Sequence, residues 1–490
     1  MVLRLTLIAA VTVLTLSGCA STDGLSTHGK LMDPSTLEGK NTLGDTSQSE
    51  LAWPQQQWWT QFNDPKLNAL IKEALENSPS LQVADARARE AQAAVIAADA
   101  ARKPTVEGEA GITRSRISRV DDPRGQGDVY GTVRNLSATA SYTFDLWGGQ
   151  RAAWEGAVGS AKAAEIDRQA ARLTLAADVA AAYNQLGLAY AVEDIAKSDL
   201  KRARNMLKLS QQRYDAGLDS QVQLKQNQSK EAASHASLLA AEQTVKSAQI
   251  QLAVLLGKGP DRGTDIERPT LIAPDTVSLP DNLPAALAGR RPDLIAARWR
   301  VEAASKNIDS AKTSFYPNLN LSATAGVKAV LGDAIFASQS QFFNVGPAIS
   351  LPIFEGGRLR SELASKDAQY DLAVANYNQS LVNAMGDIGE QITQFRSLDA
   401  RIAEQTRARD IAKSSYDIAM QRYGAGIGSY LDALSVEQQL FDADQQLASL
   451  KSERVASAIK LMQALGGGYQ VSDDLAAPEA KPTDAAAETH

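Results

Sequence analysis

The sequence predicts an α+β membrane protein in which unusually long helices are joined to four strands that need further copies of the chain to close a barrel. Three observations predict this class. The chain repeats itself once, two stretches of more than 60 residues lack proline, and short runs alternate strictly between apolar and small polar residues. Alternating runs of about ten residues are typical of strands in membrane barrels.

Composition argues against most catalytic and nucleic-acid-binding classes. Of the 490 residues, 44% are hydrophobic but only 6% are aromatic, so alanine-rich packing replaces the large aromatic cores of globular domains. One Cys excludes a disulfide framework and a Cys-based zinc site, and the three scattered His form no metal-ligand pattern. A net charge of −7 offers no basic face to nucleic acid. With no P-loop, serine elbow or zincin motif, the sequence predicts no enzyme, metal or cofactor.

The N-terminus has the layout of a secretory signal. Arg4 is followed by an apolar run to Leu16 and then by Leu16-Ser17-Gly18-Cys19, with Cys at the cleavage position. This pattern predicts a signal peptide over 1–18, acylation of Cys19 and a lipidated linker over 19–52; a chance buried Cys is the alternative. Because Ala20 rather than Asp follows Cys19, the pattern indicates delivery to the outer membrane. No later stretch offers the roughly 20 apolar residues that a membrane-spanning helix needs.

Two copies of one unit of about 210 residues make up most of the chain. Arg213-Tyr214-Asp215-Ala216-Gly217 recurs 209 residues later as Arg422-Tyr423-Gly424-Ala425-Gly426. The spacing predicts a first repeat over 53–257, a linker over 258–290, a second repeat over 291–468 and a flexible tail over 469–490. Each repeat is expected to run helix, β-hairpin, long helical hairpin, with β-hairpins at 104–147 and 317–355 and helical tips near 214–220 and 423–430.

The predicted strands are amphipathic with a period of two. From Asn135 to Asp145, apolar residues alternate with small polar ones, and the same pattern follows Pro317. One apolar and one polar face suit a barrel wall between lipid and water, although a soluble sandwich shares the alternation. A barrel in lipid must close, and known barrels begin at eight strands. Four strands per chain therefore require several chains to share one barrel.

The predicted helices are too long for an ordinary globular domain. Arg151–Arg213 spans 63 residues and Arg358–Arg422 spans 65, about 95 Å each at 1.5 Å per residue. Within the first, Ala163, Ile166 and Ala170 begin one apolar stripe, and Val179 and Tyr183 begin a second. Two stripes imply neighbours on both sides, which suits the wall of a water-filled tube; a solid coiled-coil bundle is the alternative.

Motifs along the chain resemble the TolC-type outer-membrane factors of tripartite efflux systems, in the NodT-like lipoprotein branch. The resemblance extends from about Trp53 to Tyr469. It is carried by Trp58-Trp59, Phe62-Asn63-Asp64-Pro65, Asp145-Leu146-Trp147-Gly148-Gly149, Arg291-Pro292-Asp293-Leu294, Phe315-Tyr316-Pro317, Pro352-Ile353-Phe354-Glu355-Gly356-Gly357, Arg422-Tyr423 with Gly426, and Ala464-Leu465-Gly466-Gly467-Gly468-Tyr469.

The resemblance implies a homotrimer whose 12-stranded barrel in the outer membrane continues as a periplasmic helical barrel. Substrate leaves passively, while an inner-membrane transporter of RND, MFS or aromatic-acid-exporter type works through a periplasmic adaptor. The family likeness places adaptor docking and closure at the two helical tips; a plain helix hairpin that needs a glycine is the alternative. The expected docking residues are Arg213, Tyr214, Gly217, Leu218, Asp219, Arg422, Tyr423, Gly426 and Ile427.

Gate and membrane-interface residues are also expected from the resemblance. Relatives often carry a gate Leu after the second tip, then an Asp and an Arg; this chain has Leu431 but Ser435 and Gln438. The Asp432 residues of three chains could supply a ring of three carboxylates on the trimer axis; a solvated surface side chain is the alternative. We expect an aromatic girdle or junction packing where the barrel meets the helices, formed by Tyr142, Phe144 and Trp147.

Two other functions stay open at this stage. A type I secretion duct would share the channel but carry protein in place of small toxic compounds. A lipid-anchored trimeric coiled-coil spacer would explain Cys19 and the long helices but not the alternating strands. Conductance in planar bilayers separates the spacer from a channel.

Overall fold

The protein is seen in a computed structural model that describes residues 21–37, 53–116, 130–269, 287, 289–329 and 334–476. The predicted signal peptide, Cys19, the loop after the first strand and the end of the tail lie outside the described residues. The chain divides into two compact units. One contains Met1–Leu31, Ala88–Ala164 and Ala297–Tyr377, and the other contains Met32–Arg87, Glu165–Ala296 and Asn378–His490.

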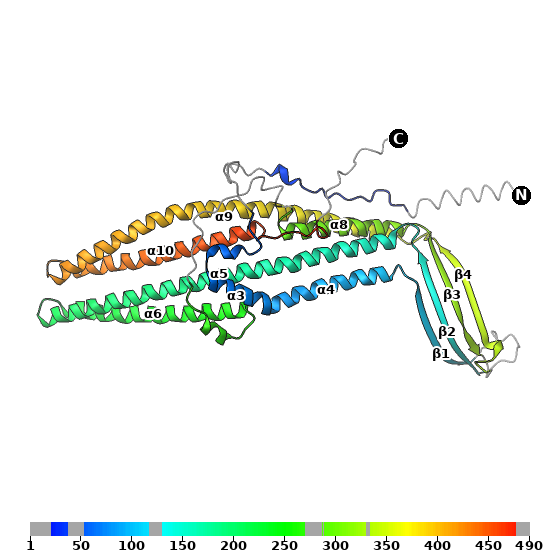
Figure 1. The fold of residues 1–490 in the computed structure, drawn as a ribbon, viewed down its shortest axis with the longest axis horizontal. Coiled ribbons are helices and arrows are strands. Elements are labelled where there is room, and N and C mark those ends of the chain that lie inside the picture. The colour runs from blue at the N-terminus through cyan, green and yellow to red at the C-terminus, as the bar shows by residue number, and fades with distance from the viewer. Residues whose placement is uncertain are drawn as a thin grey trace. The chain divides into compact units, whose positions relative to one another are not determined.

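The main elements follow one order twice (Figure 1). The first series is α4 (Pro79–Ala100), β1 (Thr105–Arg116), β2 (Tyr130–Phe144), α5 (Gly149–Asp215) and α6 (Gln221–Leu255). The second series is α8 (Pro292–Thr313), β3 (Asn318–Ala329), β4 (Gln341–Ser350), α9 (Arg358–Gly424) and α10 (Tyr430–Ala464). The two long helices are confirmed, at 67 residues each. Short 3-10 helices lie at Pro34–Thr36, Trp58–Phe62, Pro260–Asp265 and Ser338–Ser340.

A helix that the sequence analysis did not predict, α3 (Pro65–Asn77), precedes α4. The Asp64 carboxylate accepts the N–H groups of Lys66 and Leu67 and caps it, and Pro65 occupies the first turn, where its missing N–H costs nothing. Tyr183 of α5 donates its hydroxyl to the other Asp64 oxygen at 2.9 Å. This helix buries its apolar side in the main hydrophobic core of its unit, with Trp58, Trp59, Phe62, Leu67, Ile71, Leu186 and Leu252.

The four strands form one antiparallel sheet in the order β1-β2-β3-β4. Directly opposed residues share a face, and the register pairs Ala110 with Leu136 and Leu136 with Val327. One face is therefore apolar across all four strands, which confirms the predicted period of two. Its large side chains are exposed, among them Val106, Ile112, Phe343, Val345 and Ile349. A soluble sandwich would cover such a face with a second sheet.

An N-terminal segment is fastened to α9 in the unit that holds the sheet. The Arg360 guanidinium donates to the backbone carbonyls of Ser21 and Asp23. Further along, the Asp371 carboxylate accepts the backbone N–H groups of His28 and Gly29 at 2.9 and 2.7 Å. Residue 21 is thereby held at the first turn of α9, a few residues after β4 ends.

Among the described residues, none of the helices is both long and apolar enough to cross a bilayer.

Candidate functional site

The turns after α5 and α9 have the same backbone geometry. Gly217 and Gly426 adopt positive φ of 72° and 80°, which side-chain-bearing residues rarely reach. At the first turn Leu218 N–H bonds the Arg213 carbonyl, and at the second Ile427 N–H bonds the Arg422 carbonyl. These are Schellman motifs, so each helix end keeps its last carbonyls satisfied while the chain reverses. Both repeated glycines are needed for the turn itself.

Both turns present an apolar side chain to solvent. In a Schellman motif the residue after the glycine usually packs against the last turn of its helix. Here that turn carries Arg213 or Arg422, and the following Leu218 and Ile427 are 67% and 71% exposed. Val222 and Leu431, the second residues of α6 and α10, are exposed as well. Each tip therefore carries an apolar pair, Leu218 with Val222 and Ile427 with Leu431.

A polar network joins the two tips within one chain. The Arg213 Nε atom lies 3.0 Å from Asp219 Oδ1, and its Nη1 donates to the Tyr423 carbonyl at 3.0 Å. The Tyr423 hydroxyl donates to the second Asp219 oxygen, and the Arg213 guanidinium lies 4.7 Å from the Tyr423 ring centroid. We call Arg213, Asp219 and Tyr423 the tip network.

Burial strengthens the tip network. Tyr423 is 1% exposed and packs with Met206, Tyr430 and Ala433. Burial, together with the hydrogen bond to Asp219, raises the pKa of Tyr423 to about 12. Its hydroxyl therefore keeps its proton at neutral pH and remains a donor. Low local dielectric makes such a satisfied network strong and costly to break.

The second tip lacks the carboxylate of the first. Gly428 occupies the position that Asp219 has in the first repeat, 209 residues earlier. A Cβ at Gly428 would lie 2.8 Å from the Tyr423 nitrogen, so no side chain fits there. Tyr214 and Arg422, the counterparts of Tyr423 and Arg213, are exposed. The contact between the two tips of one chain is thus ionic, whereas Gly428 offers no carboxylate to Arg422 and Tyr214.

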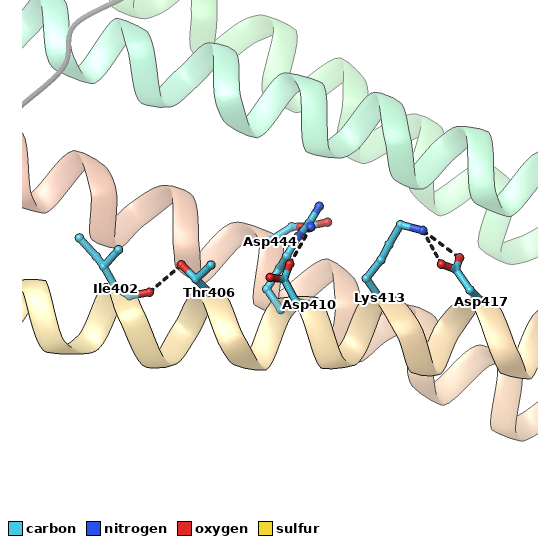
Figure 2. Close-up of polar contacts among 7 residues, drawn as sticks. Ile402, Thr406, Asp410, Lys413, Asp417 and Asp444 are labelled. Atoms are coloured by element: carbon cyan, nitrogen blue, oxygen red, sulfur yellow. Dashed lines mark hydrogen bonds and ion pairs between the residues drawn. The ribbon is translucent and has the colours of Figure 1, made fainter.

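Each helical hairpin is also tied along its length. In the hairpin of α5 and α6, Ser234 donates to Asp199 at 2.7 Å and Arg204 pairs with Glu231 at 3.0 Å. In the hairpin of α9 and α10, Arg409 pairs with Asp444 at 2.8 Å. Figure 2 shows this region, where Lys413 and Asp417 also pair within α9 at 2.7 Å. Such ties favour movement of each hairpin as a unit.

A buried acid lies where the two hairpins pack together. Glu437 of α10 is 1% exposed, and its Oε1 has no hydrogen-bond partner. Charged groups around it are Asp199 and Arg202 of α5 and Lys230 of α6. Cations of the first hairpin also face rings of the second, because Arg202 lies 6.0 Å from the Tyr416 ring and Lys230 lies 5.9 Å from the Phe441 ring. Burial raises the pKa of Glu437, with Asp199 acting in the same direction.

Stability should therefore depend on the protonation of Glu437. A carboxyl whose pKa is raised by folding holds its proton more tightly in the folded state, so the free energy of unfolding falls as pH rises from about 4.5 through the raised value. Glu437→Gln should flatten this fall and raise the free energy of unfolding at neutral pH, by about 1.4 kcal/mol for each unit by which folding raises the pKa of Glu437, because the amide carries no charge to desolvate. Thermal unfolding at pH 5 and pH 7.5 measures it.

Exposed Glu453 on the same helix provides the matched control, since Glu453→Gln should leave the unfolding temperature unchanged at both pH values. Equal pH dependence in Glu437→Gln and the unsubstituted protein would contradict the prediction.

The gate candidates line one exposed side of α10. Leu431, Asp432 and Ser435 are exposed, whereas Ala433, Glu437 and Leu440 are buried on the other side. Gln438 donates to Asp442 of the same helix at 2.8 Å. The three candidates share the exposed side of α10, whereas Tyr430 and Ala433 on its buried side pack with Tyr423 of the tip network.

Predicted interface aromatics gather where strands meet helices. The Tyr142 and Phe144 rings pack edge to face at 4.8 Å on the apolar face of the sheet. Trp147 stacks on Tyr316 at 4.9 Å and donates its indole N–H to the Pro317 carbonyl at 2.8 Å. Trp147 is therefore held by packing, and its ring remains half exposed.

Sequence reasoning missed Glu437, although a signal was present. Tyr430, Ala433 and Leu440 form an apolar stripe at helical spacing, and Glu437 falls within it. An acid inside an apolar stripe predicts either a buried partner or a raised pKa. The tip network had no such local signal, because Arg213 and Tyr423 lie 210 residues apart.

Comparisons with known proteins agree with this geometry. The family model described as outer membrane efflux protein matches residues 70–258 and 283–467. Multidrug resistance outer membrane protein MdtP of Escherichia coli (strain K12) is 30% identical over 464 residues, 93% of this chain and 94% of MdtP. Pyoverdine export outer membrane protein OpmQ of Pseudomonas aeruginosa is 32% identical over 423 residues, 84% of this chain and 88% of OpmQ.

Solved structures share the fold. The outer membrane protein VceC of Vibrio cholerae superposes with a TM-score of 0.77 at 36% identity, over 85% of this chain and 100% of VceC. The predicted resemblance, the outer-membrane localisation and the efflux function are confirmed at the level of the family. The chain belongs to the outer membrane efflux protein family.

Proposed function

We propose that the chain is the exit duct of a tripartite efflux pump that releases small toxic compounds across the outer membrane. The observation that carries the proposal is a four-stranded sheet with one exposed apolar face, connected to two tied helical hairpins. Lipid matches the apolar face, and the hairpins offer a surface for a periplasmic adaptor. Relatives named for multidrug resistance and pyoverdine export support small molecules as cargo.

The working unit in this proposal is a homotrimer with 12 strands. β1 and β4 are the outer strands of the sheet, and lipid offers no partner for their free backbone groups. Neighbouring copies would pair β1 with β4 and continue the helices as a periplasmic barrel. The repeat boundaries 53–257 and 291–468 belong to this proposal, supported by the doubled element order and by the two segments that the family model matches.

Bilayer recording tests the proposal directly. Purified protein added to a planar bilayer should give uniform conductance steps, and cross-linking should stop at three copies. A spacer would give no conductance, so its absence in folded trimers would overturn the duct. Cells lacking the protein should gain sensitivity to small toxic compounds; loss of a secreted protein instead would favour the type I secretion alternative.

Adaptor docking is proposed at the tips and closure beside them. The exposed apolar side chains of Leu218, Val222 and Ile427 supply surface that an adaptor hairpin could cover. An inner-membrane transporter of RND, MFS or aromatic-acid-exporter type would act through that adaptor. Gln221→Cys, exposed beside the first tip, should cross-link to the adaptor in cells through a photoreactive group attached to its thiol, and mass spectrometry identifies the adduct.

In the gate proposal, Leu431 narrows the resting channel and three Asp432 carboxylates set its charge. Leu431→Ala should raise resting conductance, and Asp432→Asn should lower the preference for cations, because a ring of like charges favours them. Single-channel recording with unequal salt on the two sides measures both. The control is Gln439→Ala, which changes an exposed, uncharged side chain further along the same helix. Unchanged conductance and selectivity in both variants would place the gate elsewhere.

The lipid anchor at Cys19 is also a proposal. It is supported by the bonds from Arg360 to Ser21 and Asp23, which hold the chain beside the end of β4, two residues from Cys19. In this arrangement the acyl chains would enter the inner leaflet of the outer membrane. Radiolabelled palmitate should label the protein and not its Cys19→Ser variant.

A further inference from the structure

The apolar face of the sheet ends in arginines at the loop end of β1 and β2. Opposed residues in an antiparallel pair share a face, and Ile112 on the apolar face is opposed to Arg134. Alternation along β1 then places Arg114 and Arg116 on that face too. We call these three the rim arginines. Their opposed partners complete the same end of the face: Arg114 with Thr132, and Arg116 with Tyr130.

The rim arginines are close enough to act together. Arg114 and Arg134 are diagonal neighbours in the register, which places them about 7–8 Å apart along the sheet. Arg114 lies 5.9 Å from the centroid of the exposed Tyr130 ring. Lys328 lies at the same height but is opposed to Asn135, so it belongs to the polar face. The positive charge of the apolar face is thus concentrated at one end.

Strand geometry places the rim arginines at a membrane boundary. Arg134 and Phe144 are ten residues apart on β2, about 33 Å along the strand at 3.3 Å per residue. A barrel strand tilted by about 40° converts that length to about 25 Å of height, the usual thickness of the apolar band. Tyr142 and Phe144 would mark one boundary and the rim arginines the other. A charge facing lipid is tolerated at a boundary but not at the bilayer centre.

We propose that the rim arginines bind the phosphate groups of the phosphorylated glycolipid, lipopolysaccharide, in the outer leaflet. This inference rests on the proposed barrel, in which the loop end of the sheet faces outward. Arginine suits the role because its planar guanidinium donates two parallel hydrogen bonds to a phosphate. The apolar side chains below, such as Ile112 and Leu136, would pack against the acyl chains of the same lipid.

Native mass spectrometry of the delipidated trimer tests the site with bis-phosphorylated lipid A as probe. Wild-type protein should retain this lipid at least tenfold better than dephosphorylated lipid A. Combined Arg114→Gln, Arg116→Gln and Arg134→Gln should abolish that preference. The matched control is Lys328→Gln, which removes a cation at the same height from the opposite face and should keep the preference.

Two results would overturn the proposal: equal retention of the two lipids by wild-type protein, or an undiminished preference in the triple variant. If the triple variant does not assemble, the single variants Arg114→Gln and Arg134→Gln carry the same test, each with a preference reduced severalfold. Conductance of the wild-type trimer is recorded in parallel. Its absence would contradict the duct, whereas failed lipid discrimination in a conducting trimer contradicts only the rim site.

Discussion

Cells carrying Leu218→Asp together with Ile427→Asp should lose efflux to the level of cells without the protein. Both side chains are largely exposed apolar groups at the tips, and each gains about 1.5–3 kcal/mol when fully buried by a partner. Leu218 and Ile427 together therefore contribute about 3 kcal/mol or more to adaptor binding, on the order of a hundredfold in affinity. Aspartate replaces this gain with the cost of burying a charge. Growth inhibition by exported compounds measures the loss.

The matched control keeps the tips apolar. Leu218→Met with Ile427→Met preserves the buried area that docking needs and should retain efflux. Cross-linking from Gln221→Cys to the adaptor should fall in the aspartate pair and persist in the methionine pair. Normal efflux in correctly assembled aspartate variants would show that the adaptor binds elsewhere.

Asp219→Ala should make the resting channel leak. The substitution leaves the mostly buried Arg213 guanidinium without its carboxylate and the Tyr423 hydroxyl without its acceptor. Removing one member of a buried ion pair typically costs 3–5 kcal/mol, because the remaining charge stays desolvated. We expect the two hairpins of each chain to separate at the tip, which should raise the conductance of the resting channel several times and make cells more sensitive to large antibiotics.

Two further variants test whether the leak arises from the tip network. Asp215→Ala removes an exposed carboxylate from the same tip and should leave the channel closed. Tyr423→Phe removes only the hydroxyl and should leak less than Asp219→Ala, with a double variant no worse than Asp219→Ala alone. Additive effects of the two substitutions would mean that Asp219 and Tyr423 do not act as one network.

Elements with a strong local period were predictable from the sequence. The 67-residue helices α5 and α9 lack proline and keep apolar stripes. Strand β2 alternates from Asn135 onward, and β3 alternates over its whole length. The tips were predictable because a glycine that ends a helix recurs after the same Arg-Tyr pair. Helix α3 was missed, although Asp64-Pro65 is itself a helix start signal.

The candidate site was predictable only as a set of positions. Arg213, Asp219 and Tyr423 were all expected at the tips, yet nothing local indicates that Tyr423 is buried while Tyr214 is exposed. The two tyrosines occupy equivalent positions in the repeat, and only the packing of one hairpin on the other distinguishes them. Likewise, the position of Arg134 opposite Ile112 depends on the register between two strands.

By itself the sequence determined the class of this protein: its doubled order of elements, its amphipathic strands and its long helices. Each of these features depends on neighbouring residues, because the backbone preference of a residue and the spacing of apolar side chains are local properties of the sequence. The tertiary structure alone decided which equivalent residues differ, so that Asp219 joins Tyr423 and Glu437 is buried between hairpins. These contacts bring together residues up to 238 positions apart, such as Asp199 and Glu437, and arise only when burial brings distant helices together.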